Sequence, residues 1–119
     1  MRTKEFHLGD VLSIIINRSV TVNRSVWTEE NRVRTLVGFL TGKDDWYQHR
    51  PMATAHKCRL YLVEKFPQFS TPEMEGAVED LDKEVEAANG GERAEVVVAC
   101  WLEKQVAKYG EYVTVESIV

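Results

Sequence analysis

The sequence has no long hydrophobic run and few cysteines, prolines or glycines. Its longest apolar run, Val11–Ile16, is interrupted by Ser13, so no segment reaches the roughly 18 residues that a membrane-spanning helix needs. The first residues also lack a hydrophobic stretch of signal-peptide length, which predicts a cytoplasmic protein. Three prolines and seven glycines in 119 residues exclude collagen-like and low-complexity chains.

The two cysteines, Cys58 and Cys100, are 42 residues apart and form no Cys-x-x-Cys motif. Both lie among apolar residues with helical spacing, where a free thiol behaves as a small hydrophobic side chain. A disulfide is typical of secreted proteins, and nothing in the sequence indicates secretion. We therefore expect two reduced cysteines in the core.

Motifs of catalysis are also missing. The sequence contains no Gly-x-Ser-x-Gly, no P-loop, no Gly-x-Gly-x-x-Gly and no His-Glu-x-x-His, which predicts a protein without enzymatic activity or cofactor. A metal-dependent enzyme is a weaker alternative, because imidazole, carboxylate and thiolate groups can together bind zinc. The residues of that alternative are Asp44, Asp45, His49, His56 and Cys58. No pair among them has the spacing of a metal motif, so we predict no metal ligands.

The apolar pattern predicts an α+β fold, in which a single helix-dominated domain over residues 1–119 carries a small sheet. Strand formers at Thr3–Phe6 and Tyr112–Val119 are the candidates for that sheet. About five helices are expected, at residues 8–16, 28–42, 51–65, 71–89 and 92–109. The β-branched residues Ile14–Ile16 leave a strand open as the alternative for the first of them.

Capping residues support the later helices. Thr71-Pro72 is a cap followed by a first-turn proline, and Asn89-Gly90-Gly91 is a typical helix end. Within the helices, apolar residues recur at a spacing of three and four, which predicts one buried stripe on each. The core residues predicted from these stripes are Leu36, Leu40, Leu62, Leu81, Trp101 and Leu102.

Charge is unevenly distributed along the chain. Residues 1–66 carry a balance of +4 and residues 67–119 a balance of −8. Between Glu73 and Glu86 there are seven carboxylates and one lysine. Four of them form a row at i, i+4, i+7 and i+11, namely Glu75, Glu79, Asp82 and Glu86.

Like charges at this spacing destabilise a helix, so the acidic row indicates a basic partner. One candidate is a protein with a basic surface, and the row then forms a protein-binding site. The other candidate is the basic N-terminal half of the same chain. The sequence leaves both open, and it does not determine the oligomeric state.

An alternative function is nucleic-acid binding by the N-terminal half. Arginines contact phosphates and aromatic rings stack on bases, and this half is rich in both. The arginines concerned are Arg18, Arg24, Arg32, Arg34 and Arg50, and the aromatic residues are Trp27, Trp46 and Tyr47. The acidic pI of about 5.4 opposes this alternative, because nucleic-acid-binding domains are usually basic.

Several strings resemble a family of small uncharacterised proteins from tailed phages and prophages. They are Phe6-His7-Leu8-Gly9-Asp10-Val11-Leu12-Ser13, Phe39-Leu40-Thr41-Gly42, His49, Cys58, Phe66-Pro67 and Trp101-Leu102-Glu103-Lys104-Gln105-Val106-Ala107-Lys108-Tyr109-Gly110-Glu111. The chain departs from the family at Asn17–Val26 and at Thr71–Arg93, which is unusually long and acidic here. The resemblance brings no catalytic residue or cofactor.

The resemblance implies a phage accessory protein made in the cytoplasm of a bacterial host. Small phage proteins of this kind often act by binding a host macromolecule, and inhibitors of nucleic-acid-targeting defence systems are a prominent class. We therefore expect a non-catalytic protein that binds a host protein or protein complex with a basic surface.

Overall fold

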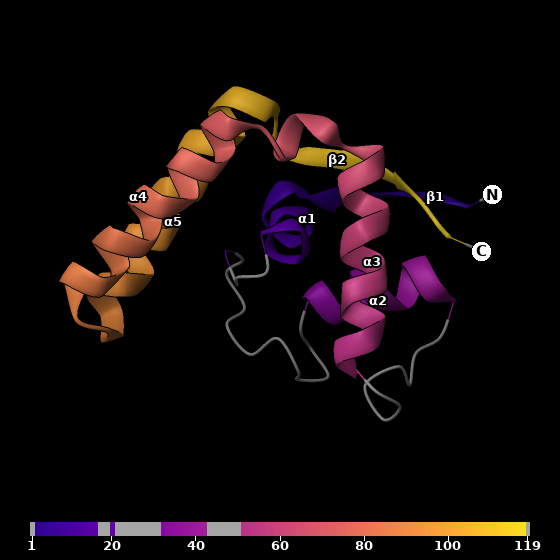
Figure 1. The fold of residues 1–119 in the computed structure, drawn as a ribbon, viewed down its shortest axis with the longest axis horizontal. Helices are drawn as coiled ribbons and strands as arrows, with labels where there is room; N and C mark the ends of the chain where they lie inside the picture. Colours follow the sequence, from indigo (N-terminus) through magenta and orange to yellow (C-terminus); the bar gives the residue numbers. More distant parts are fainter. Residues whose placement is uncertain (1, 17–19, 21–31, 43–50, 119) are drawn as a thin grey trace.

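The fold is given by a computed structural model that describes residues 2–16, 20, 32–42 and 51–118 (Figure 1). In chain order the elements are β1 (Thr3–His7), α1 (Leu8–Ile15), α2 (Arg32–Thr41), α3 (Pro51–Lys65), the 3-10 helix η2 (Pro67–Phe69), α4 (Pro72–Ala88), α5 (Gly91–Tyr109) and β2 (Tyr112–Glu116). The predicted α+β class, with five helices and a small sheet, is confirmed within these residues. Residues 8–15 form a helix, so the alternative of a strand there is wrong. Residues 28–31 of the second predicted helix lie outside the described ranges.

The elements form two groups (Figure 1). The head consists of β1, β2, α1, α2, α3 and η2, while α4 and α5 pack side by side as a helical hairpin that extends away from it. The described residues measure 40 × 28 × 21 Å along their principal axes. None of the described helices combines the length and the apolar character needed to span a bilayer.

The sheet joins the two ends of the chain. β1 and β2 are antiparallel, with Phe6 opposite Val113 and His7 opposite Tyr112. Because side chains alternate along a strand, Phe6 and Val113 are buried against the helices while Tyr112 is exposed. The pairing continues past the strand, where the Leu8 amide donates to the Glu111 carbonyl at 2.8 Å. The two predicted strands are therefore confirmed as neighbours.

Helix α1 lies at the centre of the head, and all eight of its residues are buried. Its first turn is capped by His7, whose Nδ1 accepts a hydrogen bond from the Gly9 amide at 3.0 Å. The Ser13 hydroxyl donates to the Gly9 carbonyl at 2.6 Å and accepts from the Val20 amide at 2.9 Å. A Cβ on Gly9 would lie 2.9 Å from Leu102 Cδ2, so glycine allows α5 to approach α1 this closely.

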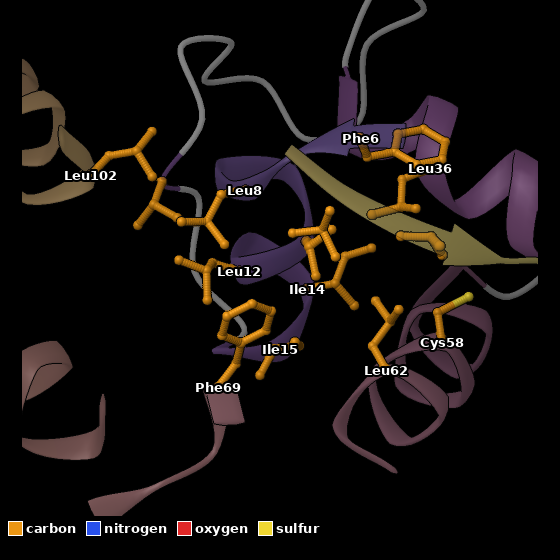
Figure 2. Close-up of a cluster of buried hydrophobic side chains, with 14 of the residues drawn as sticks. Phe6, Leu8, Leu12, Ile14, Ile15, Leu36, Cys58, Leu62, Phe69 and Leu102 are labelled. Atoms are coloured by element: carbon orange, nitrogen blue, oxygen red, sulfur yellow. The ribbon is translucent and has the colours of Figure 1, made fainter. Parts of the chain in front are cut away.

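The six core residues predicted from sequence are all buried, and Figure 2 shows the cluster around α1, with Leu102 approaching from α5. Cys58 is also buried, as predicted, and Cys100 is exposed, so the prediction for Cys100 was wrong. The reason lies in its two neighbours on α5, because Trp101 contacts α4 and Leu102 contacts the head. Successive helical residues are rotated by about 100°, so Cys100 points to the third, uncovered side.

Candidate functional site

Local sequence sets the two ends of the acidic helix α4. At its start, the Thr71 hydroxyl accepts a hydrogen bond from the Met74 amide at 3.2 Å, and Pro72 occupies the first turn. At its end, Asn89 adopts the left-handed conformation with φ of 59°, and its amide donates to the Glu86 carbonyl. The chain then reverses through Gly90 into α5, which places the two helices antiparallel.

Packing against α5 fixes the rotation of α4 about its own axis. Met74 and Leu81 are buried, and Leu81 has no exposed surface at all. The Trp101 indole Nε1 donates a hydrogen bond to the Ala77 carbonyl at 3.0 Å, which attaches α5 to the same face of α4. With this face covered, the residues half a turn away must face outward.

The four residues of the predicted acidic row are all exposed on α4. The structure places Glu75, Glu79, Asp82 and Glu86 on one face, as their spacing predicted. The last turn of α4 holds no basic residue, so the carboxylates near the carboxyl end also face the negative end of the helix dipole. The row is therefore a concentrated negative surface that the helix maintains at a cost in its own stability.

A separate flank of α4 carries an ion pair with α5. Glu73 and Lys108 form a hydrogen-bonded salt bridge at the base of the hairpin. This hydrogen bond raises the pKa of Lys108 above its ordinary value. Among the residues that the structure describes, no salt bridge joins Glu75, Glu79 or Glu86 to a basic residue.

Most residues of the alternative nucleic-acid site cannot be placed. Arg18, Arg24 and Arg50 lie outside the described residues, as do the aromatic residues predicted beside them. Arg32 and Arg34 belong to α2, of which the structure describes only the backbone at these two positions. The structure therefore does not bring the five arginines together or separate them, and the alternative stays a prediction.

Several described basic residues of the head contact the chain itself. The Arg59 Nε donates to the Ile15 carbonyl at 2.8 Å, and this bond joins α3 to the end of α1. Arg2 lies over the Phe39 ring, with its guanidinium carbon 5.4 Å from the ring centre. The Lys4 ammonium lies 5.3 Å from the centre of the Phe6 ring. These three cations thus contribute to packing within the head.

The weaker metal alternative includes three residues that lie outside the described ranges, Asp44, Asp45 and His49. Its other two residues both belong to α3, where His56 is exposed and Cys58 is buried. Burial raises the pKa of the Cys58 thiol to about 11, which disfavours the thiolate that binds metals. Across the part of the chain that is described, no three His, Cys, Asp or Glu side chains form a group that could hold a metal ion.

Comparison with protein-family models, with curated proteins and with solved structures finds no match to this chain. The acidic row is thus the candidate site that both sequence and structure support, on the geometry of α4 alone.

Sequence reasoning missed a second surface, on the flank of the hairpin where Val96 is exposed. The run Val96-Val97-Val98 could have indicated this surface, because three consecutive residues cannot all lie on one buried stripe of a helix.

Proposed function

We propose that this protein is a non-catalytic binding protein that presents the acidic row of α4 to a basic surface of a partner protein. One observation carries the proposal: four carboxylates, Glu75, Glu79, Asp82 and Glu86, lie exposed on one face of a helix whose rotation is fixed by its packing. Electrostatic complementarity of this kind mainly speeds association and selects the partner.

The hairpin is suited to this role by its shape and its charge. Helices α4 and α5 together carry ten carboxylates and four basic residues, a net charge of −6. All of this net charge comes from α4, because the charges of α5 balance. The hairpin extends from the head, so a partner can approach the row on α4 (Figure 1). A rigid element with charges in a fixed pattern loses little conformational entropy on binding.

The resemblance to phage and prophage proteins suggests where the partner lies. It supports a host protein or complex in the bacterial cytoplasm as the target, and a nucleic-acid-targeting defence complex as the specific proposal. Such complexes have basic surfaces because they bind phosphates, and an acidic helix can occupy those surfaces. This origin rests on the sequence strings, while the binding mode rests on the row.

The experiment begins with affinity capture of the partner from bacterial lysate, followed by binding kinetics with the purified partner. Glu79→Lys with Asp82→Lys should lower the association rate constant about tenfold at low salt, because it reverses two charges of the row. The matched control is Glu5→Lys with Glu64→Lys, two exposed carboxylates of the head, which changes the net charge equally. Equal losses for the two double variants would refute a role specific to the row.

Thermal stability of the same variant without any partner tests the competing explanation. If the row faces an external partner, Glu79→Lys with Asp82→Lys should leave the melting temperature unchanged or slightly raised, because like-charge repulsion within α4 is relieved. If the row instead pairs with the basic half of its own chain, the melting temperature should fall. A clear decrease, measured by circular dichroism, would contradict the proposed function.

A further inference from the structure

An open groove of about 620 Å³ lies near the tip of the hairpin, between α4 and α5. Its apolar lining consists of Ala87, Ala88, Val96 and Val97, and its charged lining of Glu84, Glu92 and Arg93. Val96 is 61% exposed, one of the most exposed large hydrophobic side chains in the described residues. Exposed apolar surface with a polar border is typical of an interaction surface.

The groove faces away from the head. Leu102 contacts the head next to Gly9, whereas Trp101 contacts α4. Val96 and Cys100 are turned away from both of these residues, since each step along the helix is a rotation of about 100°, and both are exposed. No third layer therefore covers this side of the hairpin within the described part of the protein. Two-helix units of this kind commonly bury such a face by forming a four-helix bundle.

The charges beside the groove are acidic on α4, whereas on α5 Glu92 is outnumbered by the basic residues Arg93 and Lys104. On α4, Asp80 and Glu84 are four residues apart and share the flank that lines the groove. On α5, Arg93 and Lys104 share the corresponding flank, because they lie at i and i+11. All four side chains belong to exposed residues. The surface thus has an acidic half on α4 and a half with a net positive charge on α5.

A surface with this division is complementary to itself. We propose that it pairs with the same surface of a second copy, around a two-fold axis parallel to the hairpin. This operation places α4 of one copy against α5 of the other, as an isologous interface requires. Glu84 then lies near Arg93 of the second copy, because both residues are close to the tip of the hairpin. The valines and alanines of the two grooves form the apolar centre.

The acidic row does not oppose this pairing. Asp82 and Glu86 follow Asp80 and Glu84 by two residues each, a rotation of about 200° that takes them to the opposite flank of α4. The strongest negative charge therefore stays on the outside of the dimer, away from the two-fold axis. A purely basic partner fits the groove less well, because Arg93 lines it and Lys104 lies on the same flank. The dimer is independent of the proposed function.

Sedimentation equilibrium of the full chain over a concentration series tests the interface. The wild type should be a dimer, and Val96→Glu should raise its dissociation constant at least about tenfold, because it places a carboxylate beside Glu84 of the second copy. The control is Leu60→Glu on α3, where the side chain is 54% exposed, and it should leave the constant unchanged. Circular dichroism verifies that both variants are folded.

Exchanging the charges of Glu84 and Arg93 tests whether these two residues pair across the two-fold axis. Glu84→Arg alone and Arg93→Glu alone should each weaken the dimer, because each brings like charges together across the axis. An equimolar mixture of the two variants should form heterodimers with both pairs restored, at close to wild-type affinity. A wild type that is monomeric throughout the series, an equal effect of Val96→Glu and Leu60→Glu, or a mixture that fails to associate would each overturn the proposal.

Discussion

Leu81 is the side chain on which the packing of α4 depends most. It lies in the middle of α4, is completely buried, and has α5 as its main covering element. Truncation to alanine removes three carbons, each worth about 0.8 kcal/mol of transfer free energy, or about 2.4 kcal/mol together. The remaining cavity adds about 0.5–1 kcal/mol, so Leu81→Ala should lower the free energy of unfolding by about 3 kcal/mol.

The assay is urea unfolding followed by far-ultraviolet circular dichroism, with the midpoint and the slope fitted separately. The slope should stay constant while the midpoint falls, since the surface exposed on unfolding hardly changes. In a thermal scan the same loss corresponds to a decrease of about 12 °C for a chain of this size. Leu60→Ala is the matched control, because the same three carbons leave a side chain that is 54% exposed on α3.

Leu60→Ala should lower the free energy of unfolding by less than about 1 kcal/mol, because an exposed leucine contributes little to stability and alanine favours the helix. If Leu81→Ala also costs less than about 0.5 kcal/mol, then α4 does not pack on α5 in the way described, and the exposed position of the acidic row has no basis. The measurement therefore tests the foundation of the candidate site before any partner is known.

Three further predictions concern side chains with a defined environment. At low protein concentration, a thiol reagent should modify Cys100 quickly and Cys58 only after unfolding, because the Cys58 pKa is raised to about 11. This shift stabilises the fold fully below the unfolded pKa of about 9 and is lost as pH rises through 11, so Cys58→Ala should flatten the fall in stability between these values. Thr71→Ala should lower the free energy of unfolding by about 1 kcal/mol in urea, since it leaves the Met74 amide without its cap, and Thr71→Ser should restore most of the loss.

Elements with strong local signals were predictable from sequence. The α4 boundaries follow from Thr71-Pro72 and Asn89-Gly90, and the structure uses these residues as the caps. The acidic row was predictable as well, because its exposure follows from helical spacing once Leu81 is buried. In both cases the relevant physics acts over a few residues of one helix.

Features that depend on contacts between distant residues were not predictable. Phe69 was assigned to no element and no core position from the sequence, yet it is buried in η2 and its ring lies 5.2 Å from that of Tyr109, centre to centre. The prediction that Cys100 is buried was wrong because α5 packs against both α4 and the head. Apolar neighbours in the sequence do not show which side of a helix stays exposed to solvent. The groove was not predicted for the same reason, since residues of both α4 and α5 line it.

The pairing of β1 with β2 has a consequence for how the chain folds during synthesis. Contacts within the hairpin connect residues close in sequence, so α4 and α5 can form while the chain is still emerging. The pair His7 and Tyr112 is separated by more than a hundred residues, and its loop-closure entropy opposes early formation. Val113 and Val115 belong to β2, which packs against α1 and follows all of the described helices in the chain. The head is therefore completed only after β2 has been synthesised, and until then α1 exposes apolar surface that chaperones can bind.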